Sequence, residues 1–421
     1  MFDGRTASVV QSKRLLWILC LLALALLAPS LGAKDRKNKD KKEPENKAKL
    51  VWDNLDYSRI VWPNPPAITR VKFLSQFVGE KPKDQQAPKK MGWMDRMAGV
   101  ATGESKASQP RFVLVAPYGV AVDSESRLYV ADAKVGAIFI AAPDTNDVVD
   151  MIKNGGQAHF KLITGLAIDD TNHLFVSDSM ARRVLVFDPQ HHVMASISEG
   201  MASPAGLAID NENRFLYVCD TDLDQILVYD ADPPFKLLRR IGTAGKDHTL
   251  TEAGQFSRPT NAAVDAEGNL YVSDTFNDRV EIFDADGVFI RAFGKPGDGP
   301  GYFARPKGVA IDNDGHVWVA DTVQDRIQVF TPEGRLLLYM GGHGGLPGQF
   351  STLSGLTIDK KNNRVIASEQ WPGRVQIFRY VTDEEALAEK QRRESEEQKK
   401  SLVTKPAAEM PASKQAAEVK Q

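Results

Sequence analysis

The sequence predicts an all-β protein, a six-bladed β-propeller of four-stranded antiparallel blades. One observation is a unit of three short apolar runs separated by turn residues, which occurs six times along the 421 residues. Another is the acidic residue that ends the second run of each unit, repeated at intervals of 46, 42, 54, 47 and 48 residues. Four-stranded repeats of about this length are typical of propeller blades, because one such sheet is not stable alone.

The unit within 306–330, PKGVAIDNDGHVWVADTVQDRIQVF, displays the pattern most clearly. Asn313, Asp314 and Gly315 separate its first two runs and favour a tight turn, because these residue types tolerate positive φ. The strands are expected at 308–312, 316–320 and 326–330, with a fourth at 334–342. The acids that end the six second strands are Asp132, Asp178, Asp220, Asp274, Asp321 and Glu369.

The repeated motif runs P-x-G-[VL]-A-[VI]-D, then [LV]-[YFW]-V-[AS]-D-[ST], then R-[VI]-x-[VI]-F. It resembles the NHL repeat of six-bladed propellers, and the resemblance covers roughly residues 68–380. This likeness implies the fold. It does not fix the function, because such propellers include binding proteins, lyases and lactonases.

Residues 1–33 have the organisation of a signal peptide. Arg5, Lys13 and Arg14 precede 14 apolar residues at 15–28, and small residues follow at 29–33. As a helix, 14 residues rise about 21 Å, which is less than the roughly 30 Å hydrocarbon core of a bilayer. The sequence therefore predicts an exported protein of the bacterial type, periplasmic or secreted, with membrane attachment only if this segment remains uncleaved.

A charged linker is expected at 34–50, where eight basic and four acidic side chains leave no apolar surface to bury. The alternative is a tether near anionic lipid headgroups. The propeller is expected at 51–381.

The propeller needs a strand from outside its six units. Fourth strands follow only the first five units, at 147–156, 191–200, 235–242, 287–294 and 334–342. A missing strand would leave an open sheet edge. Residues 68–79, ITRVKFLSQFVG, have a matching pattern, so we expect this N-terminal strand to close the last blade. Residues 64–66, Asn-Pro-Pro, are expected to be an extended lead-in.

Two further segments lie outside the repeats. Residues 81–110 form an insertion with a possible short amphipathic helix at 93–100, either a surface element or a lid or docking element. Residues 382–421 are expected to be a charged, largely disordered tail. A marginal helix with Thr382 as N-cap and Glu385 three residues later is expected to begin it.

The six strand-ending acids are interpreted as structural. A carboxylate at this position can accept backbone N–H bonds from the loop that it starts, and a repeat demands the same role in each blade. Basic residues recur five positions after four of these acids and are expected to brace the same loops: Arg183, Arg279, Arg326 and Arg374.

The sequence indicates no metal, cofactor or catalytic residue. The seven histidines do not share a position in the repeat, and neighbouring residues such as His191 and His192 point to opposite faces of a strand. Cys219 is expected to be a buried apolar residue, and removal of Cys20 with the signal peptide would leave no disulfide. No haem-attachment, phosphate-binding or nucleophile-elbow motif is present.

Partner contacts are expected on the top face, which holds the loops between second and third strands and those between consecutive blades. Residues two past the strand-ending acids lie at loop tips, and residues before the Gly of P-x-G ring the channel mouth. In the fourth blade, Asn261 replaces that Gly. The candidate binding residues are Tyr118, Met180, Asn261, Phe276, Lys307, Val323 and Trp371. The alternative is that the tips tuck between blades.

Two functions from different classes follow. The first is a noncatalytic extracytoplasmic propeller, expected to be a monomer, that binds a protein, peptide or envelope polymer. The second, which the family resemblance implies, is a metal-dependent lactonase or lyase with acidic, amide or imidazole ligands at the channel mouth. Nucleic acid is disfavoured as a partner, because residues 111–380 carry 25 basic against 35 acidic side chains, a net charge of −10.

Overall fold

The structure, a computed structural model, describes residues 56–80, 112–142, 145, 147–156, 158–244 and 252–403. The predicted signal peptide at 1–33, the linker at 34–50 and the insertion at 81–110 lie outside the described residues. In the part of the chain that is described, no helix is both long and apolar enough to span a membrane.

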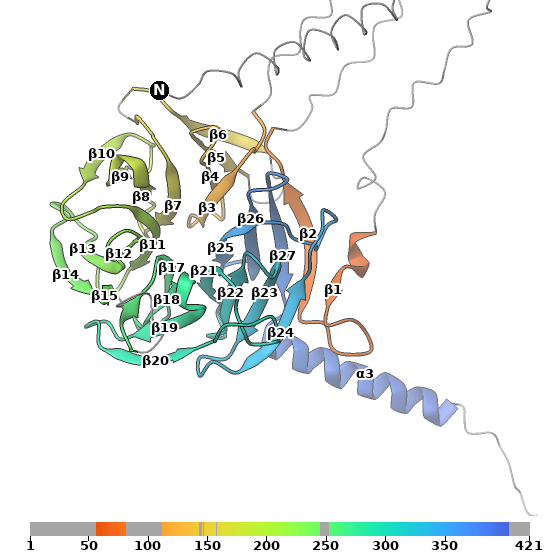
Figure 1. The fold of residues 1–421 in the computed structure, drawn as a ribbon. Coiled ribbons are helices and arrows are strands. Elements are labelled where there is room, and N and C mark those ends of the chain that lie inside the picture. Colours follow the sequence, from red (N-terminus) through yellow and green to blue (C-terminus); the bar gives the residue numbers. More distant parts are fainter. Residues whose placement is uncertain are drawn as a thin grey trace, which may run out of the picture. The chain divides into compact units, whose positions relative to one another are not determined.

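Six antiparallel sheets form the blades of a propeller, as predicted (Figure 1). Blade 1 contains β3 (Pro117–Val122), β4 (Leu128–Asp132), β5 (Ala137–Ala141) and β6 (Val148–Lys153). Blade 2 contains β7 (Ile163–Ile168), β8 (Leu174–Asp178), β9 (Arg183–Phe187) and β10 (Val193–Ile197). Blade 3 contains β11 (Pro204–Asp210), β12 (Phe215–Asp220), β13 (Gln225–Asp230) and β14 (Leu237–Ile241).

The remaining three blades have the same order. Blade 4 contains β17 (Pro259–Val264), β18 (Leu270–Asp274), β19 (Arg279–Phe283) and β20 (Phe289–Phe293). Blade 5 contains β21 (Pro306–Ile311), β22 (Val317–Asp321), β23 (Arg326–Phe330) and β24 (Leu336–Gly341). Blade 6 contains β25 (Leu353–Asp359), β26 (Arg364–Glu369) and β27 (Arg374–Tyr380), and its fourth strand is β2 (Val71–Phe77).

The hydrophobic core lies between adjacent blades. Second and third strands are nearly continuous apolar runs because both of their faces are covered by neighbouring sheets. Between blades 5 and 6, for example, Trp318 packs in one cluster with Phe350 and Phe378. No blade buries its apolar faces alone, so the ring of six blades folds as a unit.

The predicted N-terminal closure is confirmed. Strand β2 pairs antiparallel with β27, with Phe73 opposite Phe378 and Phe77 opposite Val375. Phe73 and Phe77 are buried, whereas Leu74 faces solvent. The predicted extended lead-in at 64–66 is wrong: β1 (Val61–Trp62) pairs with β2, so these residues form the connection of a hairpin that adds a fifth strand to the blade.

The C-terminal segment contains α3 (Asp383–Val403), which begins directly after the predicted N-cap Thr382. Its N-terminus carries a capping box, since Glu385 N donates to Thr382 Oγ1 (3.3 Å) and Thr382 N donates to the Glu385 carboxylate (3.2 Å). Ion pairs from Arg70 to Asp383 and from Arg379 to Glu385 attach its first turn to the propeller. The first part of the tail predicted to be largely disordered is therefore helical, and residues 404–421 lie outside the described residues.

Loops of the same design lead into blades 4, 5 and 6. A polar side chain at the middle of the third strand of the same blade accepts the N–H of a glycine with positive φ in each loop. The pairs are Glu281 with Gly254, Gln328 with Gly301 and Gln376 with Gly348. A short parallel pairing closes each loop, through β15 (Thr243–Ala244) with β16 (Gln255–Phe256), Pro296 with Phe303 and His343 with Phe350.

Three single-turn 3₁₀ helices complete the described secondary structure. They are η2 (Tyr57–Arg59), η3 (Ser179–Ala181) and η5 (Thr275–Asn277). The last two lie in the loops between second and third strands of blades 2 and 4.

Candidate functional site

The inner strands β3, β7, β11, β17, β21 and β25 surround a central channel of about 260 Å³. Each inner strand packs against the inner strands of the two neighbouring blades, as Figure 1 shows. The channel wall consists mainly of Gly, Ala, Val, Leu and Ile, because these small and branched side chains fit where six strands converge. Polar side chains gather at its ends.

The channel mouth on the top face holds the predicted ring of residues. Tyr118, Asn261 and Lys307 all line it, together with the hydroxyl-bearing Thr164 and Ser354. Lys307 Nζ lies 5.6 Å from the ring centroid of Tyr118, which is a cation–π distance. Within the described residues, Lys307 makes no ion pair, so the mouth carries a positive charge that no carboxylate neutralises.

Asn261 changes the hydrogen bonding of blade 4. In blades 2 and 6, Ser177 and Ser368 accept the N–H of the Gly at this position and donate to a carbonyl of the next blade. In blade 4, the Asn261 side chain instead accepts the N–H of Ala262 (2.9 Å). The equivalent Ser273 Oγ is fully buried and has no partner among the described residues. The irregularity predicted at this position is thus a local rearrangement of polar groups beside the channel.

The four apolar loop tips do not tuck between blades. Met180, Phe276, Val323 and Trp371 are 66%, 48%, 62% and 69% exposed. They come from four blades, and none of the ring contacts found in the described residues joins one tip to another. Phe276 differs from the other three, because guanidinium groups of two arginines stack on its ring.

The six strand-ending acids are buried, and their carboxylate oxygens accept hydrogen bonds from the loops around them. Asp132 is representative: it accepts N–H bonds from Val115 and Ala116 in the loop before the blade, and from Lys134 and Val135 in the loop after β4. The sequence pattern pointed to the second loop only. Arg279 and Arg374 contact the acid five residues earlier, both through Nε, at 2.9 and 2.7 Å.

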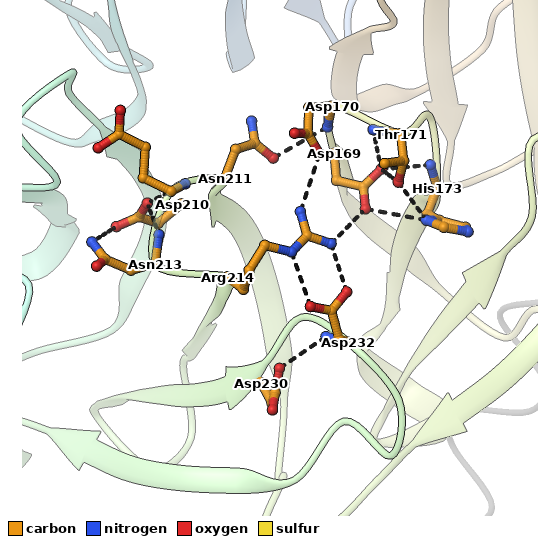
Figure 2. A network of polar contacts seen from close by, with 11 residues as sticks. Asp169, Asp170, Thr171, His173, Asp210, Asn211, Asn213, Arg214, Asp230 and Asp232 are labelled. Carbon is orange, nitrogen blue, oxygen red and sulfur yellow. Dashed lines mark hydrogen bonds and ion pairs between the residues drawn. The ribbon is translucent and has the colours of Figure 1, made fainter.

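A second ring of acids at the bottom face was missed in the sequence, although the final Asp of P-x-G-V-A-V-D marks it. These residues end the inner strands and accept backbone N–H bonds from the following turn: Asp123, Asp169, Asp210, Asp265, Asp312 and Asp359. Figure 2 shows two of them, Asp169 and Asp210, in their turns. Arg214 links the turns of blades 2 and 3 there, contacting Asp169 (3.2 Å), Asp170 (3.1 Å) and Asp232 (2.7 Å).

One group among the described residues has the residue types and spacing of a metal site, namely Asp312, Asp314 and His316 at the bottom of blade 5. Asp312 already accepts bonds from the backbone N–H groups of Asp314 and His316, from Trp318 Nε1 and from the His316 ring. The hydrogen bond to Asp312 and the charge of that carboxylate raise the pKa of His316. The group is therefore a hydrogen-bonded turn.

Two family models match the chain. The model of the SMP-30/gluconolactonase/LRE-like region matches residues 178–304, and the NHL repeat model matches residues 303–330. The resemblance to the NHL repeat is confirmed, and it lies in blade 5, where the sequence pattern is clearest. No curated protein sequence matches the chain significantly.

Solved structures with a similar fold include two lyases. A streptogramin B lyase and a selenomethionine-substituted virginiamycin B lyase from Staphylococcus aureus are each 12% identical with a TM-score of 0.47, covering 63% of this chain and 94% and 96% of theirs. Hydrazine synthase of Kuenenia stuttgartiensis is 12% identical with a TM-score of 0.48, covering 67% of this chain and 100% of that chain. These similarities concern the fold alone.

Proposed function

We propose that this chain is a noncatalytic, extracytoplasmic binding propeller that holds a protein, peptide or envelope polymer on its top face. The observation that supports the proposal best is the composition of the central channel. Among the described residues that line it, none is Asp, Glu, His or Cys. The described lining thus offers no carboxylate or imidazole as a general base or metal ligand, whereas the channel mouth offers hydroxyl, amide and ammonium groups for binding.

The alternative, a metal-dependent lactonase or lyase, is favoured by the match to the gluconolactonase-like model over residues 178–304. Such an enzyme would need several oxygen or nitrogen ligands that converge on one cation. The channel lining does not fit this requirement. Among the described residues that line it, Asn261 is the single side-chain amide, and the charged groups are the ammonium ions of Lys307 and Lys360.

Metal titration separates the two functions. The full-length purified chain is dialysed against chelator, its metal content is measured, and its thermal unfolding is recorded with Ca²⁺, Zn²⁺ or Mn²⁺ added. A binding propeller is expected to retain less than stoichiometric metal and to show no change in Tm. Binding of one ion per chain with a raised Tm would contradict the proposal, because a ligand that binds only the native state stabilises it.

Binding through the top face predicts a role for Trp371. It is the most exposed of the apolar loop tips, and Trp is enriched among residues that dominate interface energies. Trp371→Ala is expected to weaken capture of the native partner by about 2 kcal/mol, roughly 30-fold, without changing Tm. Leu387→Ala on α3, also exposed, is the control and should bind normally. Normal binding by Trp371→Ala would remove the support for this face, and early melting would show that the side chain has a packing role.

A further inference from the structure

We propose that the partner presents an acidic peptide segment to the top face over blades 4 and 5; this rests on the proposed binding function and specifies its ligand. The inference comes from three basic residues, Arg258, Arg305 and Lys307, which we call the cation track. Arg258 directly precedes β17, Arg305 directly precedes β21 and Lys307 is the second residue of β21. All three therefore lie at the top ends of inner strands.

Aromatic rings hold the cation track in place. The Cζ atoms of Arg305 and Arg258 lie 4.5 and 5.9 Å from the centroid of the Phe276 ring, and Lys307 lies on the ring of Tyr118. Stacking on a ring face positions a cation without using its N–H groups. Phe276 acts as a platform for the two arginines. Among the described residues, Arg305 Nη1 donates to the Ala304 carbonyl (3.1 Å) and to Asp278 (3.4 Å), which leaves its other guanidinium N–H groups for a ligand.

The charges of the cation track are poorly neutralised within the protein. In the described part of the chain, the side chains of Arg258 and Lys307 make no ion pair, and that of Arg305 makes one, 3.4 Å to Asp278. The Asp224 carboxylate accepts the backbone N–H of Arg258 (2.6 Å). The strand-ending acids of the same face are buried and bound to backbone N–H groups. Arg214 at the bottom face differs, since it contacts three carboxylates. Positive potential is therefore left on this part of a propeller whose net charge is negative.

A short acidic peptide fits this surface better than a long polyanion. The net charge of −10 over residues 111–380 disfavours an extended phosphate polymer, which would contact the protein well beyond the track. Lys307 stands at the mouth of a channel of about 260 Å³ with apolar walls, which has room for one side chain or a chain terminus. Val323, exposed in the neighbouring loop of blade 5, offers an apolar contact beside the charges.

The test uses the full-length chain and a fluorescein-labelled decaglutamate, followed by fluorescence anisotropy at low salt. We expect binding that weakens as salt rises, and about a tenfold loss for each of Arg258→Gln, Arg305→Gln and Lys307→Gln. Arg335→Gln is the matched control, because this exposed arginine belongs to blade 5 but lies at its opposite end. Thermal unfolding of each variant verifies that the fold is retained.

Several outcomes would overturn the inference. They are no binding of decaglutamate, an equal loss in Arg335→Gln, or inorganic polyphosphate or heparin binding more tightly than decaglutamate. If decaglutamate does not bind while Trp371→Ala still weakens capture of the native partner, the peptide assignment fails and the proposed function stands. If neither effect is observed, both fail.

Discussion

At the scale of single residues, Glu281 of β19 occupies the position of Gln328 and Gln376 in blades 5 and 6. All three are buried and accept a glycine N–H from the loop that leads into their own blade. Burial is the main cause that raises the pKa of Glu281 from about 4.5 to about 7, although Arg279 at 2.9 Å opposes the shift. The native state therefore binds a proton more tightly than the unfolded chain does.

The raised pKa predicts that Glu281→Gln stabilises the protein at alkaline pH. For an acid whose pKa is higher in the folded state, stability falls as pH rises from about 4.5 through 7 and stays lower above that value. Glutamine keeps the acceptor for Gly254 and removes the charge. We expect a gain of roughly 1–3 kcal/mol at pH 8 and little change at pH 4.5, measured by urea unfolding.

The reverse substitution in blade 5 is the control. Gln328→Glu retains an acceptor for Gly301 but loses the donor to the carbonyl of Tyr302, so it should lower stability more at pH 8 than at pH 4.5. A Glu281→Gln variant that is less stable than wild type at pH 8 would show that the ion pair with Arg279 outweighs the burial of the carboxylate.

The period of the repeat made many residue positions predictable, but it did not predict contacts between side chains of different blades. Loop tips such as Trp371 and Val323 were placed correctly in exposed loops because the period of the motif carries each residue to the same point of its blade. The arginine contacts of Phe276 were not foreseen, because Arg258 and Arg305 belong to different blades and no local pattern links them to it. Likewise, the orphaned Ser273 hydroxyl follows from Asn261, which pairs with it across two strands.

At the scale of elements, strands of five to seven residues were predictable from apolar runs between turn residues, whereas the two-residue β1 was not. A strand of two residues is too short to show a hydrophobic periodicity. The neighbouring prolines indicated an extended segment and not the connection of a hairpin. Contacts between blades also depend on turns far apart in sequence. Arg214 illustrates this, since it joins the bottom turns of blades 2 and 3 through three carboxylates (Figure 2).

Loss of this inter-blade link is expected to destabilise the protein. Arg214→Gln leaves the buried carboxylate of Asp169 without one of its partners and releases Asp232, whose pKa Arg214 lowers chiefly by hydrogen bonding. Because the arginine is partly exposed, the cost should be about 1–2 kcal/mol at pH 7. Both acids have lowered pKa values, so this contribution should disappear as pH falls through them.

Urea unfolding of Arg214→Gln at pH 7 and at pH 3 measures this effect. Arg335→Gln, which removes an exposed arginine of the same face, should leave the free energy of unfolding unchanged at both values. Equal loss of stability at the two pH values would mean that Arg214 acts through packing of its aliphatic part.

At the scale of the whole molecule, the propeller is a ring whose closure depends on a single strand from the other end of the chain. Strand β2 supplies the fourth strand of blade 6, and its Phe73 contacts Phe378 (centroids 5.5 Å apart) and Tyr57 (5.1 Å). The sequence predicted this closure by strand count, because a ring of six sheets has a fixed number of positions to fill.

Closure by β2 predicts unequal effects of neighbouring substitutions and of the two terminal truncations. Phe73→Ala should cost about 3–5 kcal/mol, because it removes a buried ring, whereas Leu74→Ala should cost much less, because Leu74 is 39% exposed. Deletion of 51–80 should expose the edge of β27 and cause aggregation. Deletion of 383–421 should barely change Tm, since exposed ion pairs such as Arg379 with Glu385 contribute little. Comparable melting of both truncated chains would mean that the ring stays closed without β2. The backbone N–H and C=O groups at the edge of β27 would then need other hydrogen-bond partners.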